Sequence, residues 1–147
     1  MDHKRILTGA VVGGIAMMAA GYVIWDVLMT DWFAANAGSA ENVWRDEPVW
    51  WAVILGTCTL AALVTAIIDK CDDLSVMNGF KWGGLIGFMI WLGVDMLLFG
   101  NSHMMTVQAA LVDPVLEFIR TGIGGAAIAA VLGMGGSGAA SAPSSDY

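Results

Sequence analysis

Charged residues are scarce in this chain, which has 6 lysines and arginines, 13 aspartates and glutamates, and 58% hydrophobic residues. A nucleic-acid-binding protein needs a basic surface for the phosphate backbone, and the chain has no such run of lysine and arginine. The formal net charge of −7 comes from a few carboxylates rather than from a charged surface that steers partners. We therefore predict no nucleic-acid partner.

Cysteine and histidine are equally few, with two of each. Cys58 lies in an apolar stretch and Cys71 in the loop after it, which predicts free thiols rather than a disulfide. The chain lacks zinc-ligand spacing, a nucleophile elbow and a phosphate-binding loop. His103 with nearby carboxylates is a hypothetical metal site, and His3 or His103 a hypothetical pigment ligand, but neither has a second ligand. We predict no enzyme and no metal site, and leave the cofactor open.

Long apolar runs, in contrast, dominate the chain. Each is long enough to cross a bilayer as a helix, and the four cover approximately residues 6–28, 49–68, 79–99 and 104–132. The connections leave no room for a separate soluble domain. The predicted fold class is all-α, a polytopic integral membrane protein with four transmembrane helices in residues 1–136 and a flexible tail at 137–147.

Basic residues predict the orientation of this bundle. Lys4, Arg5, Lys70 and Lys81 flank one side of the predicted membrane domain, whereas Arg45 is alone on the other side. Positively charged residues concentrate on the cytoplasmic side of membrane proteins, so both termini are predicted to be cytoplasmic.

Tryptophans gather at the opposite, outer side. They flank the end of the first span and the start of the second, at positions 25, 32, 44, 50 and 51. Indole rings prefer the headgroup layer because one end is apolar and the other polar. We interpret these residues as membrane anchors.

Small residues indicate where helices approach closely. Glycines four or eight residues apart form stripes on the first and third spans, at Gly9, Gly13, Gly21, Gly79, Gly83 and Gly87. Such stripes let helix backbones pack together in lipid, within one chain or between chains. The last span is also smooth, with glycines at 122, 124 and 125, and offers a surface on which a second chain could lie.

Five charged residues lie in or beside the spans, where lipid does not tolerate unpaired charge: Asp26, Asp95, Asp113, Glu117 and Arg120. The last three are spaced to share one helix face, so an internal ion pair is available. One interpretation is a proton or cation relay. In the other, Asp113 caps a helix that begins at Pro114, and Glu117 then belongs to an ordinary acidic first turn.

Several short segments carry a resemblance to known proteins. They are LTGAVVGGI at 7–15, DWFAANAG at 31–38, WAVILG at 51–56, GGLIGF at 83–88 and the closing VLGMG. Over residues 5–135 the chain resembles small four-helix bacterial membrane proteins whose activity is not established. The resemblance implies a four-helix fold and a bacterial membrane location, and nothing about activity.

Taken together, these features predict a multi-pass protein of the bacterial inner membrane, in contact with the lipid bilayer. The first hypothesis for its function is a structural or accessory subunit that contacts other membrane subunits or itself in a homo-oligomer. The second is a proton- or cation-coupled channel or carrier that uses the intramembrane carboxylates. The third is a pigment- or quinone-associated subunit of an electron-transfer complex.

Overall fold

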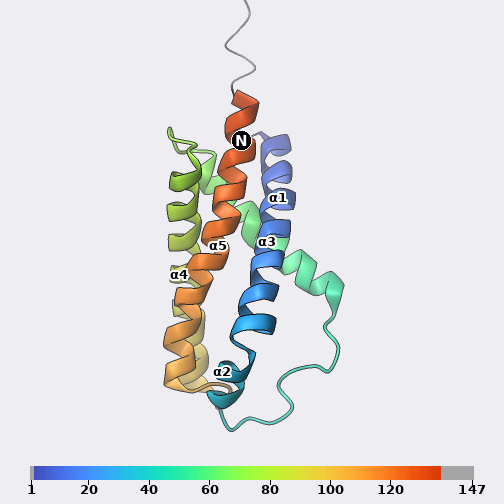
Figure 1. The fold of residues 1–147 in the computed structure, drawn as a ribbon, viewed down its shortest axis with the longest axis vertical. Helices are drawn as coiled ribbons and strands as arrows, with labels where there is room; N and C mark the ends of the chain where they lie inside the picture. Colours follow the sequence, from blue (N-terminus) through green and yellow to red (C-terminus); the bar gives the residue numbers. More distant parts are fainter. Residues whose placement is uncertain (1, 137–147) are drawn as a thin grey trace, which may run out of the picture.

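The computed structural model describes residues 2–136, and every regular element in that range is a helix (Figure 1). The elements are α1 (His3–Gly21), the π-helix η1 (Tyr22–Leu28) that continues it, α2 (Thr30–Ala35), α3 (Trp50–Ile68), α4 (Val76–Asn101) and α5 (Val107–Gly136).

Four helices in the described range are long and apolar enough to cross a membrane, as predicted. They are His3–Leu28, Trp50–Ile68, Val76–Asn101 and Val107–Met134, and their ends differ from the predicted spans by only a few residues. The tail predicted at 137–147 lies outside the described residues.

Short polar side chains set three of the helix starts. The Asp2 carboxylate accepts a hydrogen bond from the backbone N–H of Lys4 at 2.9 Å, and the Ser75 hydroxyl accepts one from Asn78 N–H at 3.3 Å. The Thr106 hydroxyl accepts one from Ala109 N–H at 3.3 Å. Each bond satisfies a backbone donor that has no partner within its own helix.

The alternative start of the last helix at Asp113 and Pro114 is therefore wrong. Helix α5 begins at Val107, after the Thr106 cap, and runs through Pro114 without a break. Proline has no N–H to donate to the carbonyl four residues earlier, which normally weakens a helix interior. Here Pro114 is fully buried, and the packing of its surroundings holds the helix continuous.

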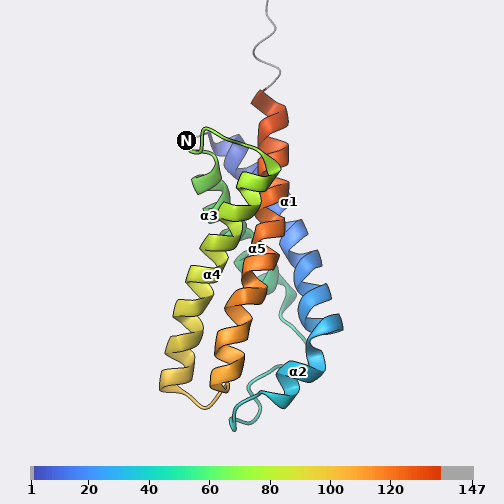
Figure 2. The same ribbon diagram turned by 60° about the vertical axis from the view of Figure 1, so that its left-hand side comes forward.

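Helices α4 and α5 form the closest pair of the bundle and lie side by side in both views (Figure 1 and Figure 2). A Cβ added to Gly83 would overlap the Thr121 carbonyl oxygen and lie 2.9 Å from Gly125 Cα. Gly79 meets the Gly125 carbonyl oxygen in the same way, whereas Gly87 lies against the Thr121 side chain. Only glycine permits the contacts at Gly79 and Gly83, because no shift of a side chain moves a backbone atom out of the way.

Helix α1 uses its glycines against two other helices. Gly9 faces Thr65 of α3, and Gly13 faces Ile128 of α5 at 2.6 Å from its built Cβ. The glycine stripes of α1 and α4 thus pack within the chain, on α3 and α5 for α1 and on α5 for α4, rather than on each other.

The face of α5 that carries Gly122, Gly124 and Gly125 is not free to bind a second chain. Gly122 meets Phe80 of α4, Gly124 meets Met17 of α1, and Gly125 meets Gly79 of α4. The proposed docking surface is wrong because α5 lies between the other long helices, which cover its small residues.

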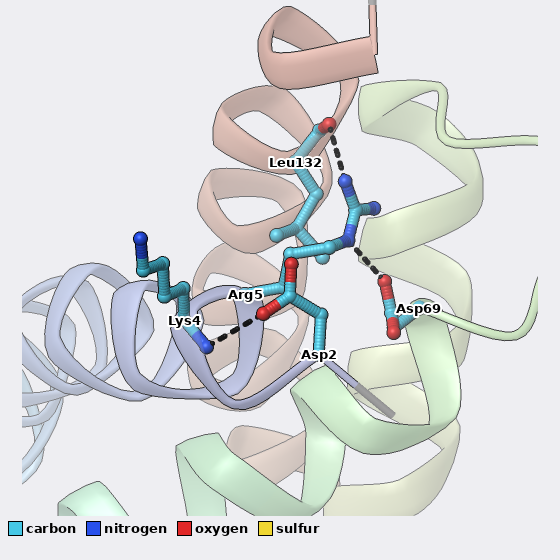
Figure 3. A network of polar contacts seen from close by, with 5 residues as sticks. All are labelled: Asp2, Lys4, Arg5, Asp69 and Leu132. Carbon is cyan, nitrogen blue, oxygen red and sulfur yellow. Dashed lines mark hydrogen bonds and ion pairs between the residues drawn. The ribbon is translucent and has the colours of Figure 1, made fainter.

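The apolar core lies towards the end of the bundle that carries the N-terminus and the end of α5. Its buried members come from α1, α3 and α5 and include Met17, Val64, Ile68, Ile128 and Leu132. At this end Arg5 pairs with Asp69 at the end of α3 and donates to the Leu132 carbonyl of α5 at 3.4 Å (Figure 3). One guanidinium therefore joins three helices.

Helix α3 follows the bundle over only half of its length. Its buried residues are Ala61, Val64, Thr65 and Ile68, all in the second half. The first half stands away from the other helices (Figure 1), and Trp51 and Leu55 are 71% and 60% exposed. The bundle is consequently open beside this first half of α3.

The opposite end of the bundle is closed by two loops. Residues 36–40 after α2 run beside the turn between α4 and α5, and Gly38 N–H donates to the Met104 carbonyl at 3.1 Å. Ala40 N–H donates to His103 O at 3.0 Å, and the Thr106 hydroxyl donates to Asn36 O at 2.8 Å. These bonds fix the start of α5.

The backbone contact between α4 and α5 predicts a sharp difference between two glycines of α4. We expect Gly83→Leu to lower the free energy of unfolding by more than the ~1–3 kcal/mol typical of overpacking, because backbone atoms of α5 occupy the space. The matched control is Gly93→Leu, since nothing lies within 4 Å of a Cβ at Gly93. Thermal unfolding of both variants in detergent measures the difference, and equal midpoints would contradict the packing.

Candidate functional site

The glycine stripes lead directly to the buried polar residues. On α4 the four-residue spacing continues from Gly87 through Trp91 to Asp95. On α5 it runs from Gly125 back through Thr121 and Glu117 to Asp113. Residues four apart share a helix face, so the register that joins the glycines also brings the acids of α4 and α5 together.

Asp95 and Asp113 face each other between α4 and α5. The two carboxyl groups interact directly with each other. Asp95 is only 2% exposed, and its Oδ2 has no hydrogen-bond partner among the described residues. An unsatisfied carboxyl oxygen in an apolar interior is costly, so this position is unusual for a purely structural residue.

Glu117 lies one turn further along α5 and forms the ion pair of the site. Its Oε2 accepts a hydrogen bond from Arg120 Nε at 2.9 Å, and Glu117 is 3% exposed. Glu117 also interacts electrostatically with Asp95 and Asp113. The cluster therefore holds three carboxyl groups beside one guanidinium.

Trp25 of η1 completes the site. Its Nε1–H donates to Asp113 Oδ1 at 3.0 Å, and the Arg120 guanidinium carbon lies 5.5 Å from the centre of the indole ring. Trp25 is predicted to be a headgroup anchor, and the structure shows in addition that its polar end faces a carboxylate of α5. The sequence does contain a signal for this, because Trp25 continues the four-residue spacing of Gly13, Met17 and Gly21.

Asp26 does not join the other charged residues. Its side chain is exposed on η1, whereas its neighbour Trp25 faces α5. Successive residues of a helix point in different directions, and here only Trp25 contacts α5. Of the five residues in the predicted relay, the structure gathers Asp95, Asp113, Glu117 and Arg120, and leaves Asp26 outside.

The cluster lies well inside the predicted membrane span. At about 1.5 Å per residue, Asp113 is about 9 Å from the start of α5 and Asp95 about 9 Å from the end of α4. Arg120 is about 20 Å from the start of α5, close to the middle of its span. Charge at such a depth normally marks a pathway or a ligand site.

The histidines and cysteines lie apart from this cluster. His3 is exposed near the start of α1, and His103 is exposed in the turn before α5. Cys58 and Cys71 are free thiols. Within residues 2–136, no three His, Cys, Asp or Glu side chains are arranged to hold a metal ion.

No family model, curated protein or solved structure matches this chain. The four apolar helices agree with the fold implied by the resemblance to small bacterial membrane proteins. The chemistry of the site therefore has to be argued from its own residues. The three carboxyl groups can hold and exchange protons, while the guanidinium and the indole N–H can donate hydrogen bonds to a small charged group.

The hydrogen bond from Trp25 to Asp113 predicts a stability loss that is independent of the function. Trp25→Phe keeps an aromatic ring below Arg120 but removes the indole donor, so we expect the free energy of unfolding to fall by about 1–3 kcal/mol. Trp44→Phe is the control, because Trp44 is 85% exposed. Equilibrium unfolding in detergent compares the two variants, and an equal response would show that the bond contributes nothing.

Proposed function

We propose that this protein moves protons across a bacterial inner membrane through the buried carboxyl cluster. The observation that carries the proposal is the pair formed by Asp95 and Asp113, whose side chains interact inside the bundle while one carboxyl oxygen of Asp95 is unsatisfied among the described residues. Ionisable residues inside membrane spans commonly form proton relays or ion pathways.

The chemistry of the pair supports a proton-carrying role. An ionised carboxylate only accepts hydrogen bonds, so two facing carboxyl groups share a bond only when one of them holds a proton. Two adjacent negative charges in an apolar interior would repel each other without water to screen them. We infer that Asp95 and Asp113 hold one proton between them.

Glu117 and Arg120 supply a second element of the proposed pathway. Their ion pair leaves little net charge at that level of the bundle. A proton that reaches Glu117 would release Arg120, and loss of that proton would restore the pair. Glu117 and Arg120 can thus be either paired or separated next to Asp113, and a proton relay requires two such arrangements.

A second candidate function is an accessory subunit of a larger membrane assembly. The observation in its favour is the first half of α3, because no other part of the described chain covers its large apolar side chains. Purification in mild detergent, followed by mass spectrometry and an absorbance spectrum, tests it. Stoichiometric foreign subunits, or a bound pigment or quinone, would favour this role, and a colourless homo-oligomer would oppose it.

The proton pathway predicts different effects for buried and exposed acids. In liposomes that contain the purified protein and a pH-sensitive dye, we expect Asp95→Asn to lower proton flux driven by a potassium diffusion potential at least tenfold. Asp26→Asn should leave the flux unchanged, because the Asp26 side chain is exposed outside the cluster. Unchanged flux in a folded Asp95→Asn variant would falsify the proton pathway.

Orientation is proposed from the basic residues, with both termini cytoplasmic. In a chain with Cys58→Ala and Cys71→Ala, a single cysteine is introduced by Asp72→Cys or Glu41→Cys, both at exposed positions at opposite ends of α3. We expect a membrane-impermeant maleimide to label the Glu41 position in intact cells and the Asp72 position only after permeabilisation. The reverse pattern would place the termini outside.

A further inference from the structure

A cavity of about 510 Å³ lies where the first half of α3 stands away from the bundle. Side chains of α3 and α4 form most of its wall, among them Leu63, Trp91 and Val94, and Arg120 of α5 contributes the charged group. This volume lies within the ~300–1,000 Å³ of ordinary small-molecule sites. The cavity does not include Asp95 or Asp113, but Arg120 both lines it and pairs with Glu117 of the carboxyl cluster.

Arg120 reaches this cavity with hydrogen-bonding capacity to spare. Its Nε donates to Glu117, while its two terminal nitrogens make no hydrogen bond to the described residues. A guanidinium carries five N–H donors in a planar fork that matches a carboxylate. The arginine side chain is 12% exposed, so the unused donors are held in a largely desolvated place.

The depth of Arg120 limits what can occupy the cavity. The guanidinium lies close to the middle of the membrane span, about 20 Å from the start of α5. A phospholipid keeps its phosphate at the membrane surface and cannot bring it to this level. A single-chain amphiphile can, because its one small head group can leave the surface when a buried cation replaces its hydration.

We propose that the cavity binds an organic carboxylate with a single apolar chain. The head group would accept hydrogen bonds from the terminal nitrogens of Arg120, and the chain would lie along Leu63 and Val94. Such a ligand would share Arg120 with Glu117 and so make a proton on Glu117 more favourable. The inference rests on the proposed proton pathway, since it names the substrate class with which proton movement is coupled.

Two glycines provide a matched pair of variants for the binding test. Gly56 lines the cavity and Gly93 does not, and nothing lies within 4 Å of a Cβ at either position. Gly56→Leu therefore fills the cavity without a clash inside the fold, and Gly93→Leu adds the same group elsewhere. Binding of radiolabelled dodecanoate to the purified full-length protein in detergent is the measurement.

We expect Gly56→Leu to weaken dodecanoate binding at least tenfold and Gly93→Leu to leave it unchanged. Arg120→Gln should weaken it by about tenfold to a hundredfold, as loss of a charge-assisted bond does, and Arg120→Lys should retain part of the affinity. If Arg120→Gln fails to fold, methyl dodecanoate on the unaltered protein makes the same comparison, because the ester lacks the negative charge.

Equal binding of dodecanoate and its methyl ester would overturn the carboxylate site, since only the apolar chain would then be recognised. Equal affinity of the Gly56→Leu and Gly93→Leu variants would overturn the assignment to this cavity. The binding measurement involves no proton flux. If dodecanoate binding depends on the cavity but Asp95→Asn leaves proton flux unchanged, the proton pathway alone is rejected. If Asp95→Asn abolishes flux but dodecanoate binding does not depend on the cavity, the carboxylate site alone is rejected.

Discussion

The backbone contact between α4 and α5 is the constraint on which the rest of the structure depends. Gly83 lies against the Thr121 carbonyl and Gly125, where any larger residue would overlap main-chain atoms. Such a contact fixes both the distance between the helices and their register, because a shift along the axis would place a larger side chain against backbone. Continued along both helices, this register places Asp95 opposite Asp113.

Burial of these acids then determines the roles of their neighbours. Charge in an apolar interior requires partners, and the bundle supplies Arg120 to Glu117 and Trp25 to Asp113. These partners do not satisfy every polar atom, since Asp95 Oδ2, Trp91 Nε1 and the terminal nitrogens of Arg120 remain without hydrogen bonds among the described residues. We place the proton at Asp95 and the substrate carboxylate at Arg120. Arg120 is accessible from the cavity beside the first half of α3.

Part of the site was predictable from spacing alone. The intervals between Asp113, Glu117 and Arg120 place them on one face of a helix, and their ion pair follows from that face. Asp26 shows the limit of the argument. Its position in an apolar run is as unusual as that of Asp95, but its neighbour Trp25 continues the packing stripe and Asp26 does not. The helical start at Asp113 was wrong because Thr106 caps the helix earlier and packing overrides the effect of Pro114.

The sequence by itself determined the number of apolar helices and their approximate ends, because length and hydropathy are properties of each segment alone. It also determined which residues share a helix face, since that depends only on helical periodicity. Tertiary structure decided which faces meet: α4 on α5, α1 on α3 and α5, and Trp25 on Asp113. Several small-residue faces are nearly equivalent in composition. Only the fit of side chains and backbone in three dimensions selects among them.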